Sequence, residues 1–332
     1  MPCYKPIVGY RSKFISPNGK YPITFSHAEA QRDKEVSLPC GQCIGCKLDH
    51  SRVWAIRCVH ESSMHLNNSF ITLTYNGKNL PEGGTLVKKH YQDFMKRLRD
   101  TIYPVKVRYF HAGEYGYIYD EKDQVVKDRV TIGDRDYYRA QLGRPHYHAC
   151  IFGYDFPDKT LWKQRNGIPL YRSKQLEKLW NKGYSSIGQV TFESAAYVAR
   201  YCTKKLNNDL EMAKGEDGTY HYEKLDPETG EIYTVEKEYT TMSRRPGIGR
   251  DWYDKYKDTD IEGDFIVLKG RKIKVPKYYM SIMEVEDNDE FQLVKDNRLI
   301  KGMESAHDNT PERLEDKEKV KEAQLNMLKR KL

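Results

Sequence analysis

Two histidines separated by a single residue are the first place where this sequence could carry out chemistry. His146 and His148 lie in "GRPHYHACIFG", residues 143–153, with Tyr147 between them. Alternate side chains of a β-strand point to the same face, so both imidazoles would project together while Tyr147 faces the other way. Such a pair can hold one metal ion, or it can be two hydrogen-bonded histidines beside a core.

A carboxylate on an earlier segment favours the metal site. Glu114 lies in "HAGEYG", residues 111–116, at the apparent end of a strand from which it could reach the face of His146 and His148. Two imidazoles and one carboxylate leave positions open on a divalent ion, as a Lewis acid for a phosphoryl oxygen requires. Mixed nitrogen and oxygen ligands favour Mg²⁺ or Mn²⁺ in a cell, although zinc would also bind.

The segment "SAAYVARYCTKKLN", residues 194–207, is expected to be a helix that carries the nucleophile. Helical spacing places Tyr197, Tyr201 and Lys204 together, opposite an apolar arc. A tyrosine that attacks a phosphate forms a stable ester, and a nearby cation offsets the developing charge. Two surface tyrosines on an amphipathic helix are the structural alternative. The apolar arc consists of Ala195, Val198, Ala199, Cys202 and Leu206.

A third group of reactive residues lies near the N-terminus. "LPCGQCIGCK", residues 38–47, contains Cys40, Cys43 and Cys46 in two consecutive Cys-x-x-Cys steps, a spacing that favours structural zinc. Cys58 follows twelve residues later, roughly 18 Å along a helix predicted over residues 47–66, so Cys3 is the expected fourth ligand. An iron–sulfur cluster is the less favoured alternative, since the further Cys-Pro of a ferredoxin run is missing. Small core residues are expected at Cys58, Cys150 and Cys202.

The elements that must position these residues follow an orderly pattern from residue 70 onward. Hydrophobic periodicity predicts strands over residues 70–75, 105–116, 145–153 and 184–192, with helices over 87–102 and 173–180. The resulting order, β-α-β-β-α-β, predicts an α+β fold of the split βαβ or ferredoxin-like type, an antiparallel sheet with helices on one face.

The rest of the chain divides around this core. We expect a Cys-rich N-terminal region with a long helix at residues 1–66, the core at 67–207, a hairpin insertion and basic loop at 208–275, and a charged C-terminal helical region at 276–332. The basic loop "SRRPGIGR" offers Arg244 and Arg245 to DNA, and Arg200 and Lys205 are further candidate contacts.

Composition excludes several classes of protein. The formal net charge of +8 and the 26 tyrosines suit phosphates and stacked bases, although a charge excess of this size is common in other proteins. No secretory signal or membrane-spanning apolar run is visible, and seven cysteines do not suit a secreted disulfide framework. We therefore expect a soluble, cytosolic protein with no membrane partner.

Several motifs together resemble one known family. "FITLTY", "RPHYHACIFG" and "YVARYCTKK" resemble, in order, the three motifs of rolling-circle replication initiators of the His-hydrophobic-His (HUH) endonuclease superfamily. Tyr147 stands where that family usually has an aliphatic residue. "MPCYKP", "LPCGQCIGC", "FHAGEYG" and "MSRRPGIG" are similar to segments of the initiators of microviruses, the gokushovirus-like group in particular.

The resemblance implies a metal-dependent nickase and strand transferase acting in the cytoplasm of a bacterial host. Such a protein cuts one strand at the viral origin, stays attached to the 5′ end through a tyrosine, and leaves a 3′ hydroxyl for a host polymerase. A host helicase is a further expected partner. Tyr197 and Tyr201 would alternate as nucleophiles, and Tyr201 is preferred for the first cut because Lys204 lies one turn beyond it.

Two other functions fit parts of the same pattern. A non-enzymatic, zinc-containing protein could present sheet aromatics to single-stranded nucleic acid, as RNA-binding sheets do. An HUH transposase would share the chemistry but usually has one tyrosine and a shorter chain, and the Cys-rich start argues against it.

Overall fold

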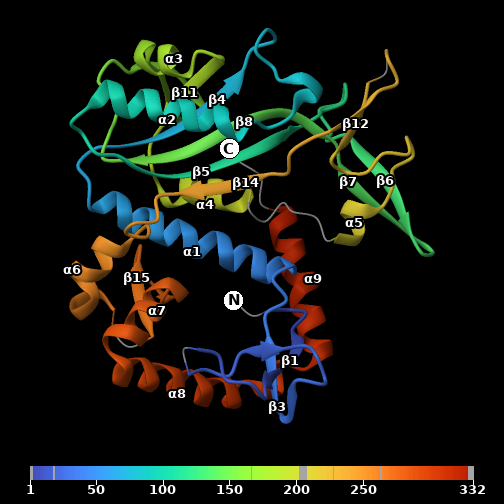
Figure 1. Cartoon of the computed structure of the whole chain (residues 1–332), viewed down its shortest axis with the longest axis vertical. Coiled ribbons are helices and arrows are strands. Elements are labelled where there is room, and N and C mark those ends of the chain that lie inside the picture. Colours follow the sequence, from blue (N-terminus) through green and yellow to red (C-terminus); the bar gives the residue numbers. More distant parts are fainter. Residues whose placement is uncertain are drawn as a thin grey trace. The chain divides into compact units, whose positions relative to one another are not determined.

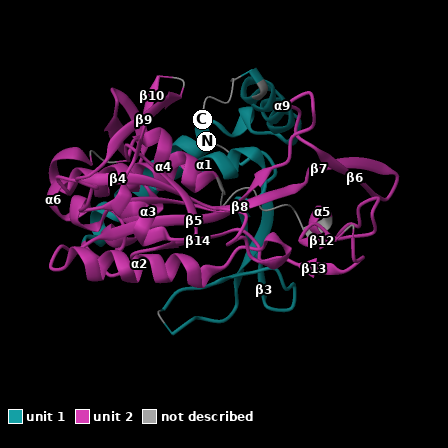
Figure 2. Ribbon diagram, turned by 90° about the horizontal axis from the view of Figure 1, so that it is seen from above, with its two compact units in different colours: residues 1–50, 287–331 teal, residues 51–286, 332 magenta. Residues whose placement is uncertain are grey.

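The computed structural model describes residues 3–17, 19–165, 167–201, 208–226, 228–261 and 264–327 (Figure 1). For Tyr201 and for residues 208, 209 and 326 it describes the backbone alone. The chain forms two compact units, one of residues 1–50 with 287–331 and the other of residues 51–286 (Figure 2). They are called unit 1 and unit 2 below.

Unit 2 contains a seven-stranded sheet in which every pair of neighbours is antiparallel. The α+β class with antiparallel sheets is therefore confirmed. The order across the sheet is β14 (Tyr239–Met242), β5 (Arg108–Tyr117), β8 (Leu142–Phe152), β4 (Asn68–Tyr75), β11 (Gly183–Gly188), β10 (Ile168–Arg172) and β9 (Thr160–Arg165). The sequence did not predict the outer strands β14, β10 and β9.

Helices α2 (Lys88–Ile102) and α3 (Lys174–Trp180) pack on one face of this sheet. Phe94 and Leu98 of α2 and Trp180 of α3 are fully buried in the same cluster as Leu73 and Tyr147 of the sheet. The apolar side chains at helical spacing over residues 87–102 are thus buried in the main core of the unit, as expected. Helix α3 begins where predicted, because the Ser173 side chain accepts a hydrogen bond from Leu176 N.

The opposite face is also covered, so the expectation of helices on one face was wrong. Helices α1 (Ile44–Ser63) and α4 (Phe192–Tyr201) bury small residues against this face. The reason is that β5 and β8 are buried on both faces along most of their length, which requires a second layer. This cluster joins Ala55, Cys58, Ala195, Val198 and Ala199 of the helices to Phe110, Ala112, Cys150 and Phe152 of the strands.

The two polar insertions of unit 2 form hairpins. The first consists of β6 (Lys127–Ile132) and β7 (Arg135–Ala140), and the second of β12 (Glu223–Leu225) and β13 (Ile232–Thr234), preceded by α5 (Asn208–Met212). Arg139 links the insertions, since its buried guanidinium donates hydrogen bonds to the carbonyls of Leu210, Ala213 and Thr219. Hairpins were expected in the second insertion, but this buried link was missed.

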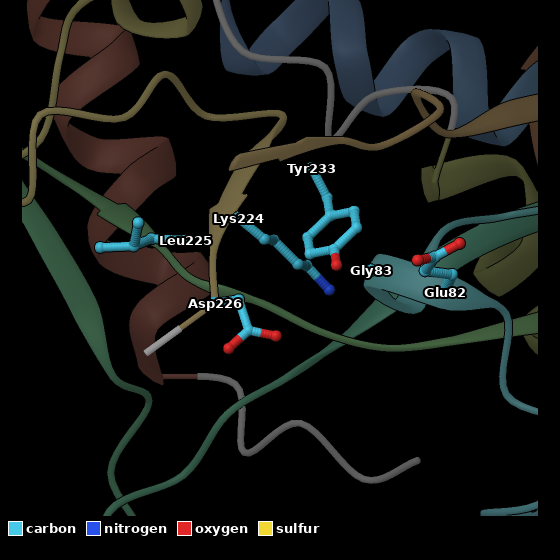
Figure 3. A pocket seen from close by; sticks show the side chains of 6 residues that line it. All are labelled: Glu82, Gly83, Lys224, Leu225, Asp226 and Tyr233. Carbon is cyan, nitrogen blue, oxygen red and sulfur yellow. The ribbon is translucent and has the colours of Figure 1, made fainter. Parts of the chain in front are cut away.

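A pocket of about 310 Å³ lies between the second hairpin and the short 3₁₀ helix η1 (Glu82–Gly84) (Figure 3). Gly83 has a positive φ of 61°, and a Cβ there would lie 2.7 Å from Tyr233 Cβ, so only glycine fits. Lys224 lines the pocket, and its ammonium lies 5.2 Å from the centre of the Tyr115 ring. Tyr115 follows Glu114 along β5, so the two side chains point to opposite faces of the sheet. This pocket is therefore separate from the histidine pair.

The last part of unit 2 follows β14. It consists of α6 (Arg250–Asp260), the hairpin β15 (Phe265–Leu268) and β16 (Arg271–Lys274), and α7 (Lys277–Glu286).

Unit 1 combines the two ends of the chain. A small sheet in the order β2-β1-β3 consists of β1 (Ile7–Ser12), β2 (Ile23–Thr24) and β3 (Ala30–Leu38), and the sequence did not predict it. The C-terminal part contains α8 (Asn288–Glu304), the 3₁₀ turn η2 (Ala306–Asp308) and α9 (Pro311–Met327). Within the described residues, no helix combines the length and the apolar character of a membrane span.

Candidate metal centres and nucleophile helix

The pairing of β5 with β8 brings Glu114, His146 and His148 together. Glu114 lies directly opposite His146, and His148 lies opposite Ala112 on the same face. Glu114 Oε1 is 2.9 Å from His146 Nε2 and 2.8 Å from His148 Nε2. The ligand atoms of all three residues lie within 4.8 Å of one another. Strand alternation predicted the shared face of His146 and His148, and the pairing register of β5 with β8 adds Glu114 to it. We call these three residues the Glu-His-His group.

Both imidazoles use their other nitrogen to contact the scaffold. His148 Nδ1 lies 2.9 Å from Thr72 Oγ1 of β4, and His146 Nδ1 lies 3.0 Å from the carbonyl oxygen of Arg144. A carbonyl can only accept, so a neutral His146 carries its proton on Nδ1 and directs the Nε2 lone pair toward Glu114. Metal-bound histidines are typically oriented by such outer hydrogen bonds.

The carboxylate of Glu114 is suited to a cation. Its side chain is only 1% exposed, and burial by itself raises its pKa. When His146 and His148 are protonated, their hydrogen bonds and positive charges outweigh this effect and lower the pKa of Glu114 to about 2. An anionic oxygen and two imidazole nitrogens that converge in this way form a donor set that fits one divalent ion.

Tyr197 is turned toward the Glu-His-His group. Its ring contacts His148 edge to face, with ring centres 5.0 Å apart and an interplanar angle of 88°. Ser51 of α1 fixes this part of α4 by donating a hydrogen bond of 2.8 Å to the carbonyl of Ala196. The exposed guanidinium of Arg200 lies 5.9 Å from the centre of the Tyr197 ring.

Several other residues predicted on this helix cannot be placed relative to Tyr197. Those outside the described part of the chain are Cys202, Lys204, Lys205 and Leu206, and the side chain of Tyr201 is not described either. For the predicted apolar arc, Ala195, Val198 and Ala199 are fully buried.

The predicted DNA-contacting arginines, Arg244 and Arg245, are exposed in the loop that follows β14. Strand β14 pairs with β5 from Gly113 back to Phe110, so this loop lies near Arg108. Arg108 precedes Glu114 by six residues, which corresponds to roughly 20 Å along a strand. The structure therefore does not bring these arginines to the Glu-His-His group.

A buried carboxylate of α1 holds this loop, and sequence reasoning missed it. Glu61 accepts a hydrogen bond of 2.6 Å from Gly249 N and pairs with Arg108. Arg57 Nε donates to the carbonyl of Ile248 at 3.0 Å. The available signal was a glutamate three residues after Cys58, on the stripe of α1 that packs on the sheet.

Four cysteines of unit 1 form a second group of possible metal ligands. The Sγ atoms of Cys3, Cys40, Cys43 and Cys46 lie within 4.8 Å of one another, and all four thiols are free. The structure thus brings Cys3 to the Cys-x-x-Cys-x-x-Cys loop, as expected. We call these residues the four-cysteine group. Cys58 and Cys150 are fully buried in the core instead.

Comparisons with known proteins agree on one family. The family model described as "Replication-associated protein ORF2/G2P" matches residues 138–206, a range that includes both histidines and both tyrosines. The chain is 32% identical over 278 residues to "Replication-associated protein ORF2" of Spiroplasma virus 4, covering 79% of this chain and 73% of that protein. It is 29% identical over 282 residues to "Replication-associated protein VP4" of Bdellovibrio phage phiMH2K, covering 84% and 76%.

A third relative, "Replication-associated protein ORF4" of Chlamydia phage 1, is 27% identical over 284 residues, covering 80% of this chain and 58% of that protein. No solved structure matches the chain significantly.

Proposed function

Since the chain belongs to the replication-associated proteins of microvirus-like phages, we propose that it initiates rolling-circle replication by nicking one DNA strand at the viral origin. The observation that carries this proposal is the convergence of Glu114, His146 and His148 beside Tyr197. A cation site next to a phenol suits attack on a phosphodiester better than it suits simple binding of a strand.

The arrangement of the sheet supports an assignment to the HUH endonucleases. In the order β5-β8-β4-β11, strand β8 lies between the two strands of the β4-α2-β5 unit, and strand β4 lies between the two strands of the β8-α3-β11 unit. This is the split βαβ or ferredoxin-like arrangement. It places the carboxylate and both histidines on the two adjacent strands β5 and β8.

The Glu-His-His group fits Mg²⁺ or Mn²⁺. When bound, such an ion polarises the scissile phosphate and offsets the charge that develops on it. Only three protein ligands converge among the described residues, which leaves coordination positions for phosphate oxygens. Thr72 and the Arg144 carbonyl hold the two imidazoles in the required orientation.

A tyrosine oxygen attacks the phosphorus, the bond from phosphorus to the 3′ oxygen breaks, and the 3′ oxygen leaves as a hydroxyl after gaining a proton. The phenol gives up its proton, and the 5′ phosphate stays on the tyrosine. Attack by a 3′ hydroxyl reverses the step without ATP, because the ester retains the energy of the phosphodiester. The contact with His148 supports Tyr197 as one nucleophile, and the Lys204 spacing supports Tyr201 for the first cut.

In this proposal, basic side chains bind the DNA strand on either side of the cut. Arg200, Lys204 and Lys205 contact phosphates near the cut, and Arg244 and Arg245 contact the strand farther away. The released 3′ hydroxyl primes a host polymerase, and a host helicase separates the strands, in the cytoplasm of the bacterial host.

The direct test uses labelled single-stranded DNA fragments that together cover the phage genome, incubated with the protein and Mn²⁺. A DNA-linked protein band on a denaturing gel is expected for the wild type and for Tyr184→Phe, an exposed tyrosine of β11. The double variant Tyr197→Phe/Tyr201→Phe should give no such band. The mechanism is wrong if the wild type forms no linked DNA or if the double variant still does.

A second experiment separates cutting from binding. The variant His146→Ala/His148→Ala should retain DNA binding in a gel-shift assay and lose the covalent product. Binding by the wild type without any nicking would instead support the non-enzymatic nucleic-acid-binding protein.

A further inference from the structure

Two separate segments of unit 1 bring the four-cysteine group together. Cys3 comes from the N-terminal segment, Cys40 and Cys43 from the loop after β3, and Cys46 from the first turn of α1. None of these residues belongs to the proposed nicking site, which lies in unit 2.

Two of the distances between the sulfur atoms match those around a single tetrahedral ion. Cys3 Sγ lies 3.6 Å from Cys40 Sγ and 3.9 Å from Cys43 Sγ. A tetrahedron of thiolates around zinc, with Zn–S bonds of about 2.3 Å, has edges of about 3.8 Å. The two distances bracket this value, and both are far longer than the S–S bond of about 2.05 Å in a disulfide. A cluster of several irons with bridging sulfides would hold the thiolates farther apart.

Backbone amides are aimed at the sulfur atoms. Cys3 Sγ accepts from Cys40 N at 3.2 Å, Cys43 Sγ accepts from Tyr4 N at 3.3 Å, and Cys40 Sγ accepts from Cys43 N at 3.3 Å. Such donors stabilise the negative charge of thiolates, which is the form that binds a metal. Second-shell hydrogen bonds of this kind accompany protein metal sites.

The C-terminal helix α9 packs on this loop. Leu314 of α9 is buried in one apolar cluster with Tyr4 and Cys43. Lys5, two residues after Cys3, forms an ion pair of 3.0 Å with Glu318 of α9, whose side chain is 10% exposed. A cavity of about 430 Å³ lies along the same contact and is lined by Tyr4, Lys5 and five residues of α9.

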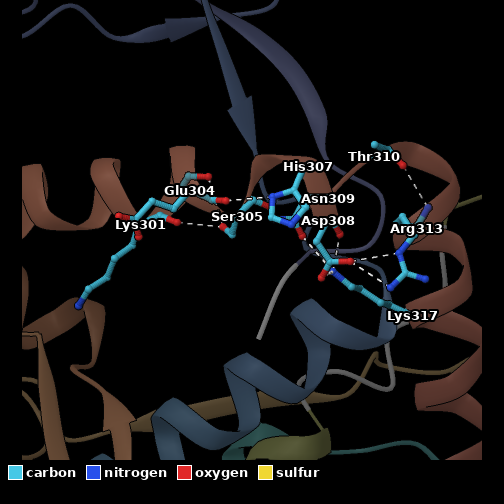
Figure 4. Close-up of polar contacts among 10 residues, drawn as sticks. Lys301, Glu304, Ser305, His307, Asp308, Asn309, Thr310, Arg313 and Lys317 are labelled. Atoms are coloured by element: carbon cyan, nitrogen blue, oxygen red, sulfur yellow. Dashed lines mark hydrogen bonds and ion pairs between the residues drawn. The ribbon is translucent and has the colours of Figure 1, made fainter.

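The start of α9 has its own anchor (Figure 4). Asp308 of the η2 turn accepts hydrogen bonds from Arg313 Nε at 3.1 Å and from Lys317 Nζ at 2.7 Å. This anchor connects α9 only to the residues immediately before it. Leu314 and Glu318 help to hold α9 on the N-terminal segment, through the cluster with Tyr4 and the ion pair with Lys5.

We propose that the four-cysteine group binds one structural zinc ion and that the zinc-bound loop is the surface on which helix α9 docks. The ion then joins both ends of the chain, since Cys3 lies near one end and α9 near the other. The described residues of unit 1 form one three-stranded sheet and helices with few buried apolar residues, the situation in which a structural metal supplies folding free energy.

The first test measures bound metal in the full chain by mass spectrometry. The variant His146→Ala/His148→Ala serves as the background, because it removes the Glu-His-His group from the count. We expect one zinc per chain there, background zinc after adding Cys43→Ser/Cys46→Ser, and one zinc after adding Cys58→Ser instead. Absence of zinc, stoichiometric iron in its place, or zinc that survives Cys43→Ser/Cys46→Ser would overturn the proposal.

The second test follows α9 by hydrogen–deuterium exchange. Chelation of the metal should abolish the protection of the amides of residues 312–327, because an isolated helix of this length is marginal in water. Leu314→Ala should cause the same loss while one zinc stays bound, which separates docking from metal binding. Protection of α9 that is unchanged after complete removal of zinc would refute the docking. Neither readout depends on DNA nicking.

Discussion

Removing the hydroxyl of Thr72 tests how the Glu-His-His group is built. Thr72→Val keeps the β-branched shape of the side chain and removes only the 2.9 Å hydrogen bond to His148 Nδ1. An ion on Nε2 requires the proton on Nδ1, where Thr72 Oγ1 accepts it. His148 is buried, so the variant leaves Nδ1 without this partner and with little access to water.

The expected size of the effect follows from that burial. A buried polar group without a partner costs about 1–3 kcal/mol. Loss of an outer hydrogen bond to a metal ligand typically weakens metal binding about 10- to 100-fold, or about 1.4–2.8 kcal/mol. The two ranges agree, so Mn²⁺ affinity should fall by between one and two orders of magnitude.

The assay is a titration of the protein with Mn²⁺ without DNA, followed by electron paramagnetic resonance of the free ion. Thr72→Ser should bind Mn²⁺ like the wild type, because it restores the hydroxyl. Thr74→Val is the matched control: Thr74 lies two residues along β4, opposite His146, and among the described contacts its hydroxyl does not bond to either histidine. Wild-type affinity in Thr72→Val, or an equal loss in Thr74→Val, would refute the reasoning.

Three further predictions concern stability, each measured by urea unfolding. Glu61→Gln should lower the free energy of unfolding by about 3–5 kcal/mol at pH 7, because it leaves the guanidinium of Arg108 without its counter-charge in a largely buried pair. Burial raises the pKa of Glu61, but hydrogen bonds from His65, Gly249 and Arg108 outweigh it and lower that pKa. The carboxylate therefore stabilises the fold above about pH 4.5 and loses this effect as the pH falls through the lowered pKa. The difference in unfolding free energy between wild type and Glu61→Gln should shrink in acid. A difference that stays constant with pH would contradict this. Leu98→Ala should cost about 2–5 kcal/mol, since Leu98 is fully buried, and a cost under about 1 kcal/mol would show that the site collapses freely. Arg139→Met should be destabilising, because three carbonyls lose a buried donor, and exchange of the amides of residues 210–219 should rise; unchanged exchange would contradict that role.

Local patterns in the sequence predicted the elements that carry the Glu-His-His group. A strand has a period of two, so the spacing of His146 and His148 placed them on one face and Tyr147 on the other, where it packs with α2 and α3. The apolar positions of residues 87–102 likewise predicted α2 and its buried side. In unit 1, the distance of Cys58 along a helix argued against it as a ligand, and Cys3, the preferred fourth cysteine, lies with the other three in the structure.

Features that depend on residues far apart in sequence were not predictable in this way. The sequence showed that β5 ends near Glu114, but the pairing register alone decided that Glu114 lies opposite His146. No local pattern distinguishes Thr72 from the other polar residues of its strand, and the pairing of β4 with β8 places it against His148. Glu61 and Arg139 were missed, because Arg108 lies 47 residues from Glu61 and Leu210 lies 71 residues from Arg139 along the chain.

The sequence by itself therefore determined which side chains share a face and where the helices and strands around the Glu-His-His group lie, because those properties repeat over two to four residues. The tertiary structure alone decided that α1 and α4 cover the second face of the sheet, that Tyr197 meets His148, and that α9 packs beside the four-cysteine group. The physical reason is that burial on both faces of β5 and β8, and the closure of the chain ends on each other, depend on contacts between distant segments that no local period records.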